Sequence, residues 1–488
     1  MKKVVEYLTI DKALDYGLKF AEKNGAEQVE IFSSNSRETN LSVEKKLPKL
    51  TAGITTGLSF RVVCKGNQGF GFTKTLTKDR LESTIKVAIA NAKSKGKDPD
   101  FKSLPLPSKK KVAKIPFDKE LEEITPDKIA EDQAYLAETI NNVKHLNFLQ
   151  SQLFHGISED RLVNSNGIDI SFKSAGYGGL AAAITTKGLI PNYAFEIQGG
   201  NSVDSFNVKN LAKEAIYEIQ RAAAPKTMNY EKEVPLILEP IASIGLMGGL
   251  FGLLVNQLRG DNVAAGSTPY SDQVGNQISV DNFTMIDNGI IPDKLSSASY
   301  DAEGIPREKT VLVDKGILQT FLLDTYYGNK LGLESNGKST RTGLMGFGDP
   351  IKTPPSIGAT TVEILGGDSS REEMIAETRE GFMVRSLMGL HMSDRSSGRF
   401  SVTAFGWYIK KGEIKFPVQG LSISGMLPEL IKNIDMISKE QKSMLLGNCP
   451  YIRFSSVPVT AKKFDLKTRF GLTMLKIITL LTGKHPMF

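Results

Sequence analysis

The stretch Val234–Asp261 (VPLILEPIASIGLMGGLFGLLVNQLRGD) is the most distinctive part of this sequence. It begins as a short apolar strand, turns at Pro240 and then carries no charged residue from Ile241 to Val255. A membrane-spanning helix needs about 20 apolar residues, so this run is too short to cross a bilayer. We therefore expect a buried helix around which the rest of the chain is organised.

Four glycines recur at helical spacing in this run, because Gly245, Gly248, Gly249 and Gly252 stand at i, i+3, i+4 and i+7. Each glycine in a helix interior costs about 1 kcal/mol relative to alanine, so such a helix needs another backbone packed against its glycine face. The pattern favours a helix packed on a sheet, and it leaves open a helix that faces a substrate channel or a partner subunit. The four glycines are therefore candidate positions for binding a peptide or a partner.

The composition is that of an ordinary globular protein. The chain has 488 residues, of which 40% are hydrophobic and 24% charged, and its net charge is +7. Its densest lysine run, Lys109–Lys111, lies among prolines in what reads as a solvated linker. A nucleic-acid surface normally combines basic clusters with aromatic residues or a reader motif, and neither is present. The sequence therefore does not favour nucleic acid as a partner.

The sequence also indicates a cytoplasmic protein. Cys64 and Cys449 stand too far apart in sequence for a disulfide framework, in keeping with a reducing compartment. We expect Cys449 to lie in a turn as a half-buried thiol, because nothing nearby in the sequence would lower its pKa. The N-terminus carries charges where a signal peptide would be apolar. The apolar segment Phe470–Leu481 is short and contains Lys476, which favours a docked terminal helix over a membrane anchor.

The alternation of apolar residues predicts an α+β fold, in which N-terminal units with antiparallel sheets precede a mostly β C-terminal domain. In the N-terminal half we expect helices over 11–24, 79–95 and 126–141, a helix capped by Asn207, and short strands over 29–32, 40–43, 58–64, 69–73, 146–153, 161–164, 168–174, 181–186 and 193–199. In the C-terminal half we expect hairpins around 314–316 and 410–413 and helices over 371–382 and 428–434.

Shifts in composition divide the chain into five parts. The expected parts are an N-terminal α+β domain (1–98), a proline-rich linker (99–116), a central α+β region (117–230), a β-rich C-terminal domain with the glycine-faced helix (231–461) and a C-terminal extension (462–488).

No familiar catalytic motif is present. A metallopeptidase helix places two histidines about one turn apart to bind zinc, with a glutamate between them to activate water. The four histidines, His145, His155, His391 and His485, do not have this spacing. A nucleophile elbow, a Walker loop and a dinucleotide-binding fingerprint are also absent from the sequence. We therefore expect no catalytic residue and no metal site in this chain.

An acidic cluster stands at Asp301–Arg307 (DAEGIPR). The carboxyl groups of Asp301 and Glu303 could serve as a general acid and base. A glycine and a proline follow at once, which favours a charged turn instead.

The same cluster resembles a segment of the TldD/PmbA (TldD/TldE) family, in which an acidic stretch precedes a strand, a tight turn and a second strand, as Thr310–Leu318 does here. Colinear blocks at 24–30, 163–167, 420–433 and 456–459 resemble the family as well. The resemblance covers about residues 5–460, and the tail after about Lys462 has no counterpart.

In that family the TldD-type subunit resembles a zinc peptidase, with a His-Glu-x-x-x-His helix and a cysteine near the carboxyl end. Here the corresponding helix positions hold Phe251, Gly252 and Asn256, and Cys449 stands near the family cysteine. This departure points to the PmbA/TldE-like branch, whose members lack the metal-binding helix motif and pair with a TldD-type subunit.

The resemblance therefore implies a non-catalytic subunit of a cytoplasmic zinc metallopeptidase that acts on unfolded or small peptides. No cofactor is expected in this chain, and zinc is expected in the partner subunit. The expected assembly is a heterodimer with a TldD-type subunit, or a homodimer when the chain is alone. Asp301, Glu303, Gly304 and Arg307 join the glycines as candidate residues for binding a peptide or the partner.

Two rival functions stay open at this point. One is a stand-alone peptide-binding or chaperone-like protein. The other is a nucleic-acid-associated regulator, which is suggested only by the description of the family as gyrase modulators and by the basic charge of the chain. Membranes are not favoured as a partner.

Overall fold

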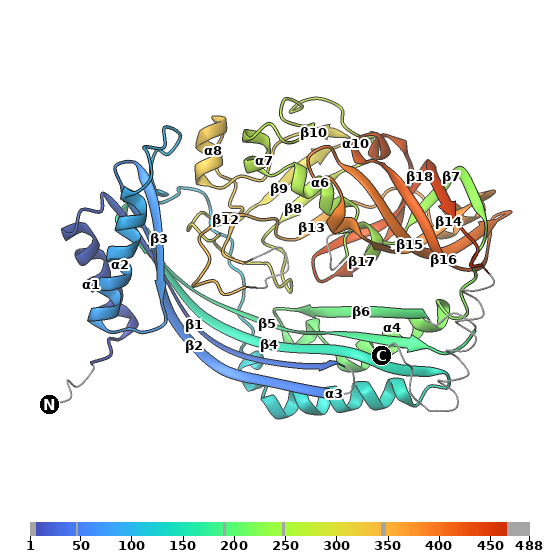
Figure 1. Ribbon diagram of the computed structural model, residues 1–488, viewed down its shortest axis with the longest axis horizontal. Coiled ribbons are helices and arrows are strands. Elements are labelled where there is room, and N and C mark those ends of the chain that lie inside the picture. Colours follow the sequence, from blue (N-terminus) through green and yellow to red (C-terminus); the bar gives the residue numbers. More distant parts are fainter. Residues whose placement is uncertain (1–5, 45–46, 189–191, 246–248, 343–347, 466–488) are drawn as a thin grey trace.

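The computed structural model describes residues 6–44, 47–188, 192–245, 249–342 and 348–465. It has two layers: a six-stranded antiparallel sheet with helices on its outer face, and a mostly β domain on its inner face (Figure 1). This arrangement confirms the α+β class expected from the sequence. Within the described residues, no helix combines the length and the apolar character needed to cross a membrane.

The six-stranded sheet has the order β3-β2-β1-β4-β5-β6. Its strands are β1 (Gln28–Glu44), β2 (Leu47–Cys64), β3 (Asn67–Thr73), β4 (Leu146–Asn164), β5 (Asp169–Thr185) and β6 (Asn192–Gly200). Its helices are α1 (Ile10–Lys23), α2 (Lys78–Lys93), α3 (Pro126–Asn141) and α4 (Val208–Arg221), with short 3-10 turns η1 (Lys119–Glu123) and η2 (Val203–Ser205).

One face of this sheet carries two separate hydrophobic cores. Val29 and Ile31 of β1 pack with α1 and α2, whereas Leu41 and Val43 of the same strand pack with α3 and α4. All four positions are odd-numbered, so they lie on the same face of the strand. The long strands thus run from one helix pair to the other, as Figure 1 shows.

Several of the strands expected from the sequence are too short, although those over 69–73 and 193–199 agree with β3 and β6 to within two residues. Residues 29–32 and 40–43 are two parts of the 17-residue strand β1, because the polar residues between them pair with β2 on one side and β4 on the other. β4 and β5 likewise each join two expected strands. The sheet therefore runs through both of the units expected at 1–98 and 117–230. Residues 99–116 cross it as a strap, in which the Pro105 carbonyl accepts from Asn164 Nδ2 at 2.9 Å.

The C-terminal layer is built on a ten-stranded sheet. β7, β14, β15, β16 and β18 form a closed ring, because β18 pairs with both β16 and β7. The strands of this sheet are β7 (Tyr230–Leu238), β8 (Met285–Asn288), β9 (Lys309–Asp314), β10 (Ile317–Leu318), β13 (Val362–Ile364), β14 (Glu380–Met388), β15 (Arg399–Lys410), β16 (Glu413–Met426), β17 (Ile434–Met444) and β18 (Gly447–Ala461).

Shorter elements complete this layer. They are the strand pair β11 (Ser339–Thr340) and β12 (Ser356–Ile357), the helices α5 (Pro240–Ser243), α6 (Phe251–Gln257), α7 (Gly260–Ala264), α8 (Thr325–Leu331), α9 (Arg371–Ala376) and α10 (Leu427–Leu430), and the 3-10 turns η3 (Leu390–Met392) and η4 (Ile431–Asn433). The helix expected over 371–382 is too long, because α9 ends at Ala376 and residues 380–382 belong to β14. The helix expected over 428–434 is also wrong, because α10 ends at Leu430, a 3-10 turn follows, and Ile434 begins β17.

The expected hairpins are confirmed. β9 pairs with β10 across Lys315-Gly316, and β15 pairs with β16 across Lys411-Gly412. Both residues of each turn have positive φ, from 46° to 78°. This is the conformation that two-residue hairpin turns require, and a glycine adopts it at no steric cost.

The continuous glycine-faced helix is wrong for the described residues. α5 ends at Ser243, α6 begins only at Phe251, and Gly249 between them has a left-handed φ of 55°. This turn folds the chain back, so that the Leu250 amide donates to the Ala242 carbonyl at 3.0 Å. Gly248 lies outside the described residues. Gly249 therefore serves to reverse the chain, and Gly252 lies beyond this reversal in α6, so the described glycines do not line one face of a single helix.

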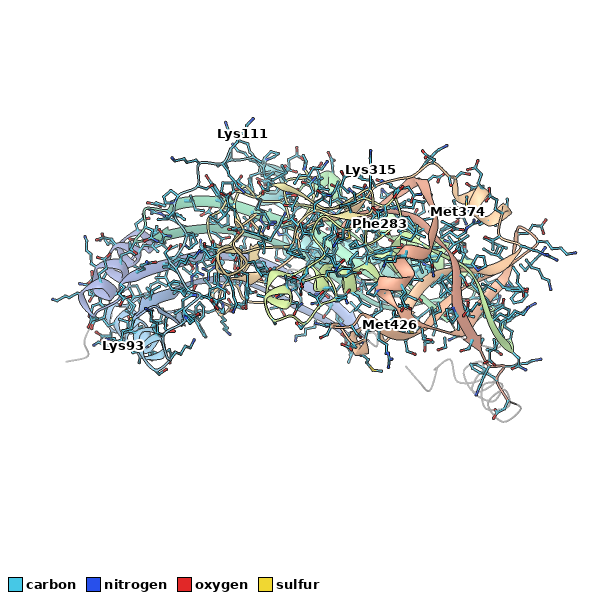
Figure 2. The ribbon with its side chains drawn as sticks, turned by 90° about the horizontal axis from the view of Figure 1, so that it is seen from above. Lys93, Lys111, Phe283, Lys315, Met374 and Met426 are labelled. Carbon is cyan, nitrogen blue, oxygen red and sulfur yellow. The ribbon has the colours of Figure 1, made fainter. Side chains whose placement is uncertain are left out.

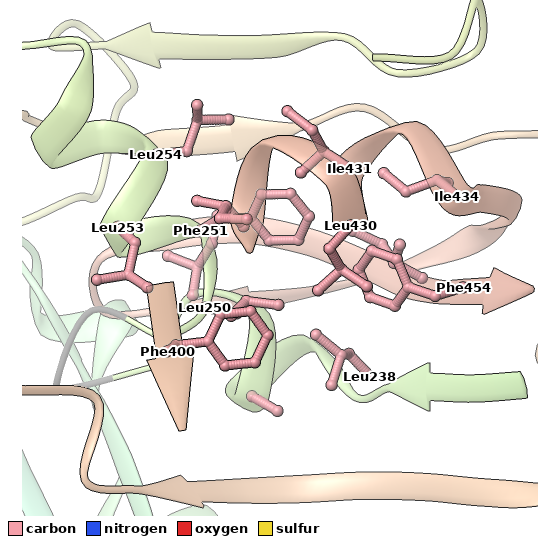
Figure 3. Close-up of a cluster of buried hydrophobic side chains, with 14 of the residues drawn as sticks. Leu238, Leu250, Phe251, Leu253, Leu254, Phe400, Leu430, Ile431, Ile434 and Phe454 are labelled. Atoms are coloured by element: carbon pink, nitrogen blue, oxygen red, sulfur yellow. The ribbon is translucent and has the colours of Figure 1, made fainter. Parts of the chain in front are cut away.

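After this reversal, α6 enters the main hydrophobic core. Phe251 stacks on Phe283 with 5.4 Å between ring centroids, and Phe283 lies in the interior of the molecule (Figure 2). Figure 3 shows the side chains of Leu250, Phe251, Leu253 and Leu254 beside buried residues of other elements, namely Leu238, Phe400, Leu430, Ile431, Ile434 and Phe454. The buried position expected for this stretch is thus present, although the single helix is not.

Gly249 in this turn and Gly252 in α6 should respond in opposite ways to alanine. A Cβ at Gly249 would lie 2.3 Å from the Ser243 carbonyl oxygen, whereas a Cβ at Gly252 would meet no atom of another segment within 4 Å. We expect Gly249→Ala to lower the free energy of unfolding by about 2 kcal/mol or more, since it adds left-handed strain to overlap. Gly252→Ala should be neutral or stabilise by up to about 1 kcal/mol. Urea unfolding of both variants checks this, and equal effects would contradict the turn.

Candidate functional site: a buried interface between the two layers

Cys449 lies inside β18, not in the turn expected from the sequence. It is fully buried, and burial raises the pKa of its thiol. A hydrogen bond with the Ser243 side chain of α5 lowers this pKa, but by less than burial raises it. The thiolate is the form that binds metals and attacks electrophiles, so this cysteine is held in its unreactive form. Within the described residues, no three His, Cys, Asp or Glu side chains are grouped so that they could hold a metal ion.

A small hollow marks the place where α5 meets the six-stranded sheet. It is lined by Ile244 and Gly245 after α5, by Glu196 and Ile197 of β6, and by residues 444–446 at the end of β17 and in the turn to β18. Its volume is about 10 Å³, which is room for about one water molecule and not for a peptide. Among the candidate glycines, Gly245 therefore borders the interface between the layers.

The first buried charge cluster, which we call the Arg61 network, consists of Glu30, Arg61, Glu303 and Arg341. Arg61 of β2 stands opposite Glu30 of β1 in the sheet and forms an ion pair with it. Nη1 of Arg61 donates to Oε1 of Glu303 at 2.7 Å, and Nη2 of Arg341 donates to Oε1 of Glu30 at 2.8 Å. These four side chains are at most 10% exposed. Because Glu303 and Arg341 belong to the C-terminal layer, the network joins the two layers.

Glu303 is held in its charged form. Burial alone would raise the pKa of its carboxyl, but the Arg61 guanidinium outweighs burial and the pKa is lowered. The second carboxylate oxygen accepts from the Thr325 amide at 2.9 Å. Both carboxylate oxygens of Glu303 thus accept hydrogen bonds inside the protein.

Two neighbouring carboxyl groups behave in the opposite way. Burial, and then the charge of Glu303, raise the pKa of Asp301 and that of Asp324 to about 7 each. Asp301 accepts three backbone hydrogen bonds, from the amides of residues 303, 305 and 339, at 2.9, 3.0 and 3.0 Å. Asp324 caps α8 and accepts from the Tyr327 amide at 2.8 Å. The two carboxylates and two guanidinium groups of the Arg61 network already balance, so ionisation of Asp301 or Asp324 would add an uncompensated negative charge beside Glu303.

The structure brings Asp301, Glu303 and Gly304 together in one turn. Gly304 has a φ of 81°, and a Cβ there would lie 3.0 Å from Ile168 of the N-terminal layer, so the turn presses against the first sheet. Arg307 leaves the turn and donates to the Ser296 carbonyl. Because Asp301 and Glu303 are buried and bonded, either could contact a peptide only if the two layers moved apart.

The second buried charge cluster, which we call the Arg385 network, also joins the layers. It consists of Glu196, Glu218 and Arg221 of the N-terminal layer and Glu239, Arg385 and Lys442 of the C-terminal layer. Arg385 of β14 lies 3.2 Å from a carboxylate oxygen of each of the three glutamates. Arg221 bridges Glu218 and Glu239, and Lys442 pairs with Glu196. Its three carboxylates and three cations balance, and Glu239 stands at the start of α5.

Sequence reasoning missed these networks, although it identified Glu303. A signal was present, because Arg61 and Arg385 are single charges within strongly apolar strand segments, and Glu30 stands between Val29 and Ile31. A charge at such a position is buried only if it is paired. The partner could not be identified, since Arg61 and Glu303 stand 242 residues apart in the chain.

Comparison with known proteins assigns the layers to a family. Residues 231–461 match the PmbA/TldA metallopeptidase C-terminal domain, and residues 29–92 match the PmbA/TldA metallopeptidase domain 1. The matched ranges include most of the ten-stranded sheet and the half of the first sheet that carries Arg61. The fold is therefore that of a metallopeptidase-family protein. The chain belongs to the PmbA/TldD family, which confirms the resemblance seen in the sequence.

Individual relatives agree with this assignment. An uncharacterized protein of Methanocaldococcus jannaschii is 25% identical over 433 residues, which are 88% of this chain and 96% of that protein. The metalloprotease PmbA of Escherichia coli O157:H7 is 32% identical over 192 residues, 39% of each chain. The crystal structure of TldE from Thermococcus kodakarensis superposes with a TM-score of 0.81 at 26% identity, over 92% of this chain and all of that one.

The raised pKa of Asp324 gives a testable pH dependence. A carboxyl whose folded pKa lies above its ordinary value stabilises the fold at low pH, and this contribution is lost as the pH rises from about 4 to 7. We expect Asp324→Asn, which keeps the helix cap, to gain on the order of 1–3 kcal/mol relative to wild type between pH 5 and pH 8.

Urea unfolding at both pH values measures this difference. Asp394→Asn is the control, because hydrogen bonds from Ser397 and Ser396 lower the pKa of that exposed aspartate and place its titration below this window. A constant difference between Asp324→Asn and wild type would contradict the raised pKa.

Proposed function

We propose that this chain is a non-catalytic, PmbA/TldE-like subunit of a metallopeptidase complex that acts on unfolded or small peptides. Its relatives are named as metalloproteases, and its fold is shared with TldE. In this proposal zinc and the catalytic glutamate belong to a TldD-type partner subunit, and the assembly works in the cytoplasm.

The observation that most directly supports this proposal is the chemistry of the side chains in α6. The positions that match the histidines and glutamate of the family's metal helix hold Phe251, Gly252 and Asn256, and none of these side chains is an ordinary zinc ligand. Phe251 is fully buried and stacks on Phe283, so it belongs to the core. Asn256 is engaged locally, since Asn262 Nδ2 donates to its backbone and side-chain oxygens at 2.7 and 3.3 Å.

Cys449 does not replace the missing ligands. A structural zinc site needs four ligands and a catalytic one three, and Cys449 is a single thiol whose pKa is raised by burial. The residues present therefore do not fit a zinc ion. The structure around α5 is nevertheless held in place, because the Arg385 network fixes the start of α5 through Glu239.

In this proposal the chain forms one wall of a peptide chamber, and the partner subunit forms the rest of that chamber. Exposed sheet edges and backbone groups can position an extended peptide through main-chain hydrogen bonds without any catalytic side chain. The glycine and acidic candidate residues act in this proposal by shaping the wall.

The proposal is tested by reconstitution with a TldD-type homologue that keeps His-Glu-x-x-x-His. The isolated chain should contain far less than one zinc per chain by metal analysis and should not cleave an unfolded protein. Co-expression should give a stable complex with peptidase activity that neither chain shows alone. That activity should vanish when the glutamate of the partner is changed and persist in Cys449→Ser of this chain.

Other outcomes would select the rival functions. One zinc per chain that is lost in Cys449→Ser would overturn the absence of a metal site. If the homologue cleaves peptides equally well alone, the subunit role fails and a stand-alone peptide-binding protein becomes the better account. DNA binding that weakens steeply with rising salt would favour the nucleic-acid regulator instead.

A further inference from the structure

A hollow of about 850 Å³ lies over β16, β18 and β7, which are neighbouring strands of the closed ring in the C-terminal layer (Figure 1). It is placed where β7 begins and β18 ends, and we call it the ring hollow. Its volume falls within the range of about 300–1,000 Å³ that is typical of small-molecule sites. The ring hollow shares no residue with α6, the Arg61 network or the Arg385 network.

A row of three polar side chains borders the ring hollow. Ser422 of β16 pairs with Thr460 of β18, and Thr460 pairs with Glu231 of β7. Residues directly opposite each other on neighbouring strands share one face of a sheet. The next residues on β18 and β7, Ala461 and Tyr230, belong to the main hydrophobic core, so the row lies on the opposite face, which is exposed.

The ring hollow also contains one acidic and one basic side chain, Glu231 and Lys462. Lys462 directly follows β18, and the next amide, that of Lys463, donates to Oδ1 of Asn229 at 2.9 Å, beside the start of β7. Among the residues that the structure describes, neither Glu231 nor Lys462 has an ion-pair or hydrogen-bond partner for its side chain. Two opposite charges, both available to a ligand, therefore border the same hollow.

Gly420 leaves one side of the ring hollow open. It has a φ of 79°, and a Cβ there would meet no other atom within 4 Å. Because this glycine adds no side chain, the hydroxyl groups of Ser422 and Thr460 stay accessible. A hydroxyl both donates and accepts hydrogen bonds, so these two groups suit the N–H and the carbonyl oxygen of a peptide group.

We propose that the ring hollow binds a short peptide with two free ends, with the α-ammonium group at Glu231 and the α-carboxylate at Lys462. Lys462 stands two residues beyond Thr460 and is therefore diagonal to Glu231. Diagonal neighbours on adjacent strands are about 7–8 Å apart, so a dipeptide spans the two charges better than a single amino acid does. The peptide group between the ends then lies beside the hydroxyl groups. A ligand with one charge would leave the other charge of the hollow unpaired.

This inference does not rest on the proposed metallopeptidase role. The binding is measured on the isolated chain, so its failure leaves the subunit role untouched, and failure of the subunit role leaves the ring hollow untouched. If both proposals hold, this chain binds the kind of small product that peptide cleavage releases, at a place outside the packed surroundings of α6.

The test is isothermal titration calorimetry of the full-length chain with Gly-Gly as the probe. We expect a Kd of about 1 mM, because the ion pairs at both ends are exposed and each contributes little. N-acetyl-Gly-Gly lacks the ammonium group and Gly-Gly amide lacks the carboxylate. Each should bind about threefold more weakly than Gly-Gly, since each loses one ion pair.

Variants of the two charged residues assign the ends of the ligand. Glu231→Gln should weaken Gly-Gly about threefold and remove its advantage over the N-acetyl form. Lys462→Gln should do the same for the advantage over the amide. Each variant should leave the preference at the other end unchanged, which a general loss of the fold would not do.

Glu233→Gln and Lys463→Gln are the matched controls, because they remove neighbouring charges from the same two segments and neither residue lines the ring hollow. Both should leave Gly-Gly binding unchanged, and all four variants should melt at nearly the temperature of wild type, since the changes are on the surface. Three results would overturn the inference: no binding of Gly-Gly at about 10 mM, tighter binding of glycine than of Gly-Gly, or a preference for Gly-Gly over its blocked forms that survives in Glu231→Gln and Lys462→Gln.

Discussion

The ion pair between Arg61 and Glu303 is the contact on which the two-layer arrangement depends most. Removing both charges from water is costly, and the pair recovers this cost only through close geometry and further hydrogen bonds. Both conditions are met here, because Arg61 also binds Glu30 and Glu303 also accepts from a backbone amide. A displacement of the C-terminal layer would leave several charges buried and unpaired. The Arg385 network applies the same constraint at another part of the interface, so buried charges in two places fix the relative position of the layers.

This constraint relates the fold to the proposed function. In the proposed role the chain would supply no metal ligand and would act through its shape, which requires that α5 and its surroundings stay in place. Glu239 holds the start of α5 through Arg221 and Arg385, and Gly249 reverses the chain so that Phe251 fills the core. The helix α6, which the resemblance aligns with a metal-binding helix, is part of the packed interior.

The sequence predicts those features that depend on local chemistry. The turns at Lys315-Gly316 and Lys411-Gly412 need only residues that adopt positive φ, and the hairpins followed from them. The length of β1 was underestimated because residues Ser33–Thr39 are polar, although backbone pairing with strands on both sides holds them extended. The glycine run was misjudged because helical spacing of glycines does not reveal that one of them, Gly249, adopts a left-handed conformation. Asp301–Arg307 was identified as a charged turn, but its partners could not be, since a buried ion pair is set by tertiary contacts across more than 200 residues.

The most direct test of the account is a double-mutant cycle on Arg61→Met and Glu303→Gln, followed by urea unfolding. The cycle isolates the energy of the interaction between the two side chains from their other contacts. We expect a coupling energy of about 2 kcal/mol or more. Each single variant should be destabilised by several kcal/mol, because Arg61→Met leaves the buried Glu303 carboxylate without its cation and Glu303→Gln leaves the buried Arg61 with Glu30 as its one remaining carboxylate. A parallel cycle on the exposed pair Asp15 and Lys19 should show little coupling. A coupling between Arg61 and Glu303 as small as that of the exposed pair would show that buried charges do not hold the two layers together.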